Sequence, residues 1–387
     1  MPAPARRVAP FGNTVFSEIN ALARQHNAVN LGQGMPDFDG PAAAIEAAVT
    51  ALRSGANQYP PGPGIEALRQ GVASHALRFY NLRVDPTDGV LVTPGATEAV
   101  FCAIMGLVDP GDEVIIIEPF FDSYAPGVLM AGAQAVYVPL HPPDWTFDPA
   151  ELRAAFSART RAVIVNTPHN PTGRVFTYAE LALIADLCQE FDVTVISDEV
   201  YEHLVYDDAR HIPIATLPGM FSRTVTIGSA GKTFGMTGWK VGWAYGPPEL
   251  IGGVWRAHQF VTFATNHPAQ HAVAHAFTLD GTYYEDYQDL YQRKRALLLE
   301  GLTAAGFKVT PPQGTYFVMA DFSAIFSGNA DTFARHMIEN IGVACIPPGS
   351  FYSPEHRSLG DRYVRFAFCK NDDTLREAVR RLMKLLK

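Results

Sequence analysis

Cysteine, clusters of basic residues and long apolar stretches are all scarce in this chain of 387 residues. The cysteines stand far apart in the sequence, which argues against a zinc site or a disulfide framework. They are Cys102, Cys188, Cys345 and Cys369. The formal net charge is −9, and no run of Lys and Arg is long enough to bind a phosphate backbone, so we do not expect a nucleic-acid partner.

No apolar stretch approaches the length that crosses a bilayer, and residues 1–11 lack the apolar core of a secretory signal. We therefore expect a cytoplasmic protein without a membrane partner. Apolar residues are nevertheless abundant, since hydrophobic residues make up 48% of the chain and charged residues 18%, a composition far from that of disordered chains. A chain of this length is expected to form two domains, each with a sizeable core.

Short apolar runs alternate with longer helical patterns between about residue 45 and about residue 265, which is typical of stacked βαβ units. Strands are predicted at residues 90–93, 113–117, 135–138, 162–165, 193–197, 224–227 and 241–245. Several of these runs are apolar without alternation, as strands covered on both faces should be. The sequence therefore predicts an α/β fold with a mainly parallel central sheet flanked by helices.

The pattern changes at about residue 283. Helices are predicted at residues 283–305, 331–341 and 372–387, and strands at residues 315–320 and 363–368. This order indicates a smaller α+β domain. The expected division is an N-terminal arm at residues 1–40 that belongs to the small domain, a large domain at 41–278 and a C-terminal small domain at 279–387. Since no flexible linker separates them, they should share an interface, where ligands commonly bind.

A lysine follows the predicted strand 224–227 in the segment SAGKTF at residues 229–234. Lys232 should lie at the carboxyl edge of the sheet, where open α/β sheets bind ligands. An amine at that edge can attack an aldehyde and form an imine. A lysine in a surface loop is the simpler interpretation, and the neighbouring strand ends argue against it.

Two further strand ends carry polar side chains. Asp198 follows strand 193–197, and Tyr201 comes three residues later. A carboxylate at this edge can pair with a protonated pyridine nitrogen, and a tyrosine hydroxyl can donate a hydrogen bond to a phenolate oxygen. Strand 162–165 ends in a turn whose prolines and glycine hold the Asn170 amide in one place.

A helix start suited to a phosphate group follows strand 90–93. Gly95, Ala96 and Thr97 open this helix, and its free N–H groups and positive dipole end can bind an anion. Ser229 and Lys240 are additional candidate phosphate ligands. Together with Lys232, these residues would hold a phosphate-bearing aldehyde at one edge of the sheet.

These motifs resemble the class I aminotransferases of fold type I, which carry pyridoxal 5′-phosphate, and the resemblance extends from Leu31 to Arg365. Segments 32–38 (GQGMPDF) and 237–242 (TGWKVG) are similar to the kynurenine and glutamine-phenylpyruvate aminotransferase branch. Segment 166–171 (NTPHNP) is especially similar to bacterial methionine aminotransferases. The resemblance implies an enzyme that moves an amino group from an amino acid to a 2-oxo acid by a ping-pong mechanism.

The resemblance also implies roles for individual residues. Lys232 would form a Schiff base with the cofactor and act as the general base. Asp198 would face the pyridine nitrogen, and Asn170 and Tyr201 the phenolate oxygen, while Tyr124 would stack on the ring. The expected phosphate ligands are Gly95, Ala96, Thr97, Ser229 and Lys240, joined by Tyr59 from the other subunit of a homodimer with shared active sites.

The same resemblance leads to expectations about the substrate. Arg365 would bind the α-carboxylate as a bidentate fork, helped by Gly34 and Asn170. No second arginine stands at a recognisable position to bind a distal carboxylate, so dicarboxylate selectivity is not expected. Phe16, with Met35, suggests an apolar wall suited to methionine, aromatic and glutamine-type amino acids, although Phe16 could simply pack the N-terminal arm.

Other functions fit parts of the sequence. The same site could support kynurenine transamination, or β-elimination from cysteine S-conjugates, which only product analysis separates from transamination. A cofactor-binding regulator without turnover would carry a DNA-binding extension, and no basic segment precedes residue 30. Residues 62–67 fit a loose dinucleotide fingerprint, but no strand precedes them. His267, His271 and His275 recur at helical spacing without a carboxylate or cysteine, so we expect no metal site there.

Overall fold

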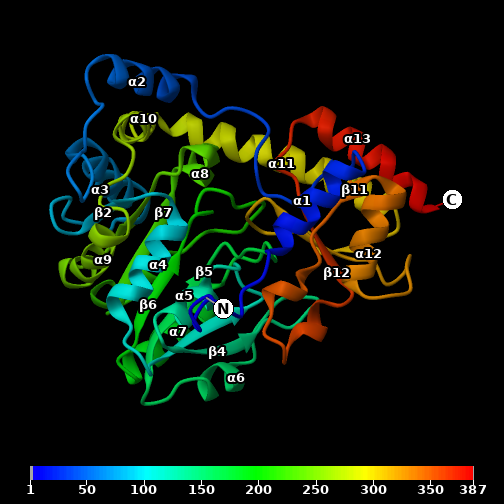
Figure 1. The fold of residues 1–387 in the computed structure, drawn as a ribbon, viewed down its shortest axis with the longest axis horizontal. Helices are drawn as coiled ribbons and strands as arrows, with labels where there is room; N and C mark the ends of the chain where they lie inside the picture. Colours follow the sequence, from blue (N-terminus) through cyan, green and yellow to red (C-terminus); the bar gives the residue numbers. More distant parts are fainter. Residues whose placement is uncertain (1–2, 387) are drawn as a thin grey trace.

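The computed structural model describes residues 3–386 and contains a central seven-stranded sheet (Figure 1). The strand order across it is β2-β8-β7-β6-β5-β3-β4. The strands are Val90–Thr93 (β2), Glu113–Glu118 (β3), Gln134–Pro139 (β4), Thr160–Asn166 (β5), Thr194–Asp198 (β6), Thr224–Ser229 (β7) and Gly242–Tyr245 (β8). The seven predicted strands are therefore confirmed, with small shifts at their ends.

The sheet is mainly parallel, as predicted. Strand β8 is the exception, because it runs antiparallel to both of its neighbours, β2 and β7. The pairs β3–β4, β3–β5, β5–β6 and β6–β7 are parallel. The carboxyl ends of β5, β6 and β7 consequently meet at one edge, which brings the segments after these strands together.

Helices cover both faces of this sheet. In β3, Ile116 packs into the cluster that includes α4 (Ala96–Leu107) and α9 (Pro248–Val261), whereas Ile115 packs into the cluster that includes α7 (Tyr178–Glu190). Successive side chains of a strand point to opposite faces, so a strand covered on both faces must be apolar throughout. Further helices are α2 (Ala42–Arg53), α3 (Glu66–Tyr80), α5 (Tyr124–Met130), α6 (Pro149–Ala154), α8 (Ala230–Thr233) and α10 (His267–Ala276).

Side-chain caps explain where several helices begin. Thr177 and Glu180 form a capping box at the start of α7, in which each side chain accepts a hydrogen bond from the other residue's backbone N–H. Asn266 caps α10 by accepting from the backbone N–H of Ala269, and Pro268 occupies the first turn, where its missing N–H costs nothing. These local signals were readable from the sequence.

A second sheet, antiparallel and in the order β12-β10-β9, lies in the C-terminal part of the chain. Its strands are Lys308–Val309 (β9), Phe317–Asp321 (β10) and Tyr363–Ala367 (β12), and the accompanying helices are Gly281–Ala304 (α11), Ala330–His336 (α12) and Asp372–Leu382 (α13). The predicted smaller α+β part is therefore confirmed. The helix predicted at 331–341 differs in detail, because it continues as a π-helix over Met337–Ile341. The last predicted helix ends at Leu382 and is followed by a 3₁₀ turn.

The N-terminal segment packs on this C-terminal part (Figure 1). Helix α1 (Val15–Gln25) places Ile19 in the same core cluster, and β1 (Val29–Asn30) pairs in parallel with β11 (Val343–Ala344). The β1–β11 pair was not predicted, because strands of this length carry no periodic pattern. The domain boundaries at residues 40 and 278 stay a prediction. Among residues 3–386, no helix combines the length and the apolar character needed to cross a membrane.

Candidate active site

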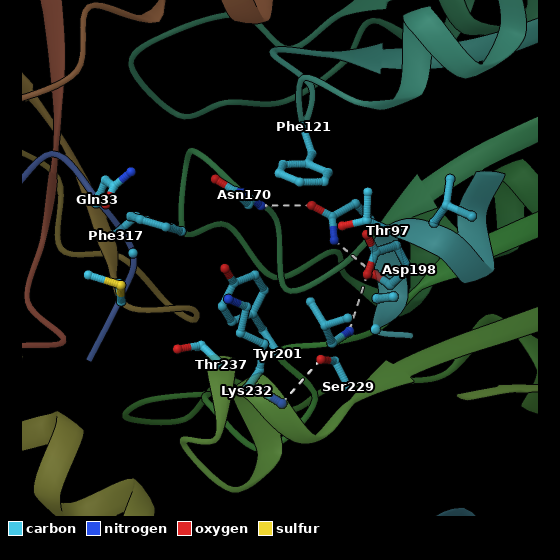
Figure 2. A pocket seen from close by; sticks show the side chains of 18 of the residues that line it. Gln33, Thr97, Phe121, Asn170, Asp198, Tyr201, Ser229, Lys232, Thr237 and Phe317 are labelled. Carbon is cyan, nitrogen blue, oxygen red and sulfur yellow. Dashed lines mark hydrogen bonds between the residues drawn. The ribbon is translucent and has the colours of Figure 1, made fainter. Parts of the chain in front are cut away.

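A cavity of about 370 Å³ opens at the carboxyl edge of the large sheet, where it meets the N-terminal segment and the second sheet. Figure 2 shows Phe121, Asn170, Asp198, Tyr201 and Lys232 around this space. The predicted site residues that line it are Phe16, Gly34, Gly95, Ala96, Thr97, Tyr124, Asn170, Asp198, Tyr201, Ser229, Lys232, Lys240 and Arg365. Residues from both sheets therefore converge on one cavity.

Lys232 enters the cavity from the short helix α8, directly after β7. Ser229 caps this helix by accepting a hydrogen bond from the backbone N–H of Gly231 at 3.2 Å. The Lys232 Nζ atom lies 5.8 Å from the ring centre of Tyr201 and 5.4 Å from that of Tyr316. Burial lowers the pKa of Lys232 to about 8, although the negative charge of Asp198 acts in the opposite direction. A larger share of this amine is consequently neutral, and nucleophilic, near neutral pH.

Asp198 ends β6 beside Asn166, its register partner at the end of β5. The Tyr124 hydroxyl donates to Asp198 Oδ2 at 2.5 Å, and the Asn166 amide donates to the Asp198 backbone carbonyl at 2.8 Å. Burial raises the pKa of Asp198, although the hydrogen bond from Tyr124 opposes that shift. A buried carboxyl group in this position favours a positively charged partner inside the cavity.

Arg365 reaches the cavity from β12 in the second sheet and is buried. Its Nη1 donates to Asn170 Oδ1 and its Nη2 to the Gly32 carbonyl, both at 2.9 Å, while its buried Nε has no hydrogen-bond partner. The guanidinium lies 4.0 Å from the ring centre of Phe317 and 5.2 Å from that of Phe16. These contacts hold the positively charged guanidinium group of Arg365 in largely apolar surroundings, and such a group can bind a carboxylate ligand through two hydrogen bonds.

The start of α4 provides a place for an anion. Gly95 precedes the helix with φ +83°, a conformation that favours glycine, and a Cβ atom there would lie 3.2 Å from Lys240 Nζ. Absence of that Cβ leaves room beside a lysine ammonium and the free N–H groups of the first turn. The residues present therefore fit a group that combines a phosphate, an aldehyde and a basic ring nitrogen, as pyridoxal 5′-phosphate does.

Tyr59 was predicted to reach the cofactor of the other subunit, and Tyr124 to stack on the cofactor ring; both stay predictions. Tyr59 does not line the cavity of its own chain; it is 84% exposed and its ring centre lies 5.4 Å from that of Phe263. Tyr124 lines the cavity, but its hydroxyl is engaged with Asp198.

Phe121, Gln33 and Phe317 also line the cavity, although no role was predicted for them from the sequence. Phe121 points into it from the segment after β3 (Figure 2). Its place after a buried strand at the same sheet edge was the signal that could have identified it. Gln33 and Phe317 reach the cavity from outside the large sheet, so its strand pattern could not assign them.

Comparison with known proteins agrees with this geometry. The family model for aminotransferase class I and II matches residues 26–382. A probable N-succinyldiaminopimelate aminotransferase of Mycobacterium tuberculosis is 48% identical over 387 residues, covering 98% of each chain. Kynurenine–oxoglutarate transaminase 1 of Homo sapiens is 41% identical, covering 98% of this chain and 97% of its own.

The predicted resemblance to kynurenine and methionine aminotransferases is confirmed, whereas the N-succinyldiaminopimelate relative was not anticipated. Methionine aminotransferase of Escherichia coli is 38% identical and covers 99% of this chain. The structure of the M. tuberculosis N-succinyldiaminopimelate aminotransferase superposes with a TM-score of 0.96 over 99% of this chain and all of that one. The chain belongs to the class I and II aminotransferases.

Proposed function

We propose that this aminotransferase uses pyridoxal 5′-phosphate to move the amino group of an amino acid with an uncharged side chain to a 2-oxo acid. Methionine, aromatic and glutamine-type amino acids are the proposed donors. The observation that carries the proposal is the meeting of Lys232, Asp198 and Arg365 in one cavity. Lys232 provides an amine nucleophile, and Asp198 provides a carboxyl group that can pair with a ring nitrogen. Arg365 provides a guanidinium group that can bind a carboxylate.

The proposed cofactor contacts follow from the positions of the polar groups. Lys232 would hold the aldehyde carbon, Asp198 the pyridine nitrogen, and Asn170 and Tyr201 the phenolate oxygen. The phosphate would be held by Gly95, Ala96, Thr97, Ser229 and Lys240. When bound, the cofactor supplies an electron-withdrawing ring that stabilises negative charge at the substrate α-carbon.

The chain's own residues supply the remaining chemistry. Arg365 binds and orients the α-carboxylate through its two Nη groups, in exchange for present partners such as Asn170 Oδ1. Lys232 holds and moves a proton at the substrate α-carbon, and its pKa of about 8 suits a base that works near neutral pH. Asp198 stays oriented by the hydrogen bond from Tyr124.

Tyr124 and Phe121 share the task of placing the cofactor ring in this proposal. The sequence-based expectation was that Tyr124 stacks on the ring. Since the Tyr124 hydroxyl donates to Asp198, we infer that Tyr124 also orients this carboxyl group. Phe121, which points into the cavity, is the side chain that we propose covers one face of the ring (Figure 2).

Substrate preference can be predicted from the charges that line the cavity. Its basic side chains within the described residues are Lys232, Lys240 and Arg365, and the proposal uses all three. Met35 and Phe317 contribute apolar surface to the cavity wall, and such a surface suits thioether and aromatic side chains of a substrate. We expect kcat/KM for methionine, and for phenylalanine or kynurenine, to exceed that for aspartate by at least about tenfold, or about 1.4 kcal/mol. Initial rates against a panel of amino acids and oxo acids measure this directly.

N-succinyldiaminopimelate belongs in the same panel, because a relative at 48% identity bears the name of an aminotransferase for it. It is the second candidate donor. Cysteine S-conjugates should also be included, with pyruvate release as the sign of β-elimination. If aspartate or N-succinyldiaminopimelate proves the best donor, the charge argument is wrong, while the proposed cofactor contacts stand independently.

We also propose a homodimer with shared active sites. Phe260 is 86% exposed, and its neighbours Val261 and Phe263 are also exposed. Tyr59, which is 84% exposed, packs against Phe263. An exposed apolar group of this kind is typical of a protein interface. In the proposed dimer, Tyr59 would contact the phosphate group of the cofactor bound to the neighbouring subunit.

Hybrid dimers test this arrangement. When Lys232→Ala and Tyr59→Ala chains are unfolded, mixed and refolded, half of the dimers combine both chains, and one site of each such dimer is intact. Activity should therefore recover to about a quarter of wild type if Tyr59→Ala alone is nearly inactive. Each variant carried through the same treatment alone is the control. A monomer with full activity at assay concentration would contradict the shared site.

A further inference from the structure

A second cluster of ligand-type side chains lies apart from the active-site cavity. It consists of His75 on α3, and Glu202 and His203 in the segment after β6. The Nε2 atoms of the two histidines are 2.7 Å apart, and His75 Nε2 lies 3.9 Å from Glu202 Oε1. The side chains of His75 and Glu202 are only 4% and 6% exposed. None of these residues lines the cavity described above.

We propose that His75, Glu202 and His203 bind one divalent transition-metal ion, zinc by preference. Bonds of about 2.0–2.1 Å from zinc to nitrogen or oxygen place neighbouring tetrahedral ligands roughly 3.3 Å apart. The two separations of 2.7 and 3.9 Å fall on either side of that spacing. These two atom pairs therefore need to move by only about 0.6 Å each to match zinc geometry, and all three ligand atoms lie within 4.8 Å of one another. Two imidazoles and one carboxylate are a donor set that zinc takes in proteins.

Buried carboxyl groups beside the cluster favour a bound cation, whereas the positive charge of Arg78, which acts on both histidines, opposes it. Glu202 is buried near a second buried carboxylate, Glu199, which is itself held by His211 at 2.8 Å and by Ser197 at 2.7 Å. Among residues 3–386, no lysine or arginine forms a salt bridge with Glu202. Burial raises the pKa of Glu202 and so disfavours its ionised form, and a bound metal ion would offset that cost.

The surroundings also resemble the outer shell of a metal site. The Tyr80 hydroxyl donates to Glu202 Oε2 at 2.6 Å, which leaves Oε1 facing His75. His203 is only partly buried, which provides an entry path for the ion.

The site would join two distant segments of the chain. His75 belongs to a helix on the face of the sheet, whereas Glu202 directly follows Tyr201, a residue of the active-site cavity. A metal ion at this point stabilises the folded chain in proportion to its affinity, because the unfolded chain lacks the assembled ligands. We therefore expect zinc to raise the Tm of the holoenzyme.

Metal retention by the untagged holoenzyme tests the proposal. The protein is treated with a chelator, incubated with excess Zn²⁺, passed through gel filtration and analysed by mass spectrometry for metal content. We expect roughly one equivalent of zinc per chain. Replacement by Co²⁺ should give visible ligand-field absorption. Wild-type protein that retains less than about a tenth of an equivalent would overturn the site and leave the two histidines as a hydrogen-bonded pair.

Two variants locate the ion. His203→Gln removes a partly exposed ligand and should lose nearly all zinc, whereas His271→Gln should retain it. The latter is the matched control, because His271 stacks on His267 on α10, with ring centres 5.2 Å apart, and would hold an adventitious surface ion. Equal retention by His203→Gln and wild type would overturn the assignment. Should His203→Gln fail to fold, Tyr80→Phe, which removes only the hydroxyl on Glu202, is expected to weaken zinc binding about tenfold.

Discussion

Lys232→Ala is expected to lower kcat by at least about 10⁴-fold and to abolish the visible absorbance that arises when the cofactor is joined to this lysine. The reason is that one amine performs two tasks in the proposed mechanism: it holds the aldehyde carbon, and it moves the proton at the substrate α-carbon. Its place in the cavity at the end of β7 makes both tasks possible. Absorbance spectra and single-turnover rates with methionine measure the two losses separately.

The matched control is Lys308→Ala, which removes an exposed lysine of β9 far along the chain and should leave both measurements unchanged. A small exogenous amine is expected to restore a little of the rate of Lys232→Ala, because it supplies a base without a tether. Turnover by purified Lys232→Ala within about tenfold of wild type would refute the assignment.

Arg365→Lys is expected to lower kcat/KM for methionine by roughly 10³-fold, or about 4 kcal/mol, mostly through a higher KM. Lysine keeps the positive charge but cannot form two parallel hydrogen bonds to a carboxylate. It would also leave Asn170 Oδ1 or the Gly32 carbonyl without its present donor, in a buried place. Steady-state kinetics with methionine give the two parameters.

A substrate analogue shows whether the loss concerns the carboxylate. The amine 3-(methylthio)propylamine matches methionine but lacks that group, so wild type should strongly prefer methionine and Arg365→Lys should lose most of the preference. Arg161→Lys is the control, since this exposed arginine of β5 only donates to the Leu107 carbonyl. An unchanged preference in Arg365→Lys would show that another group binds the carboxylate.

The sequence by itself determined the large sheet and the polar residues at its edge. Apolar runs between helical patterns located its strands because burial on both faces requires apolar residues at every position. Asp198 and Lys232 were identifiable because each directly follows such a run, and parallel strands place their carboxyl ends at one edge. Arg365 and Phe16 were proposed through the family resemblance rather than through any local pattern.

Only the tertiary structure decided how distant segments meet. The reversal of β8, the pairing of β1 with β11, and the hydrogen bond from Tyr124 to Asp198 carry no local signal. Asn170 and Arg365 are 195 residues apart in the chain, yet they share a hydrogen bond. His75 likewise reaches His203 across 128 residues. The physical reason is that periodicity and caps report contacts within one element, whereas these contacts depend on how two separately formed layers pack together.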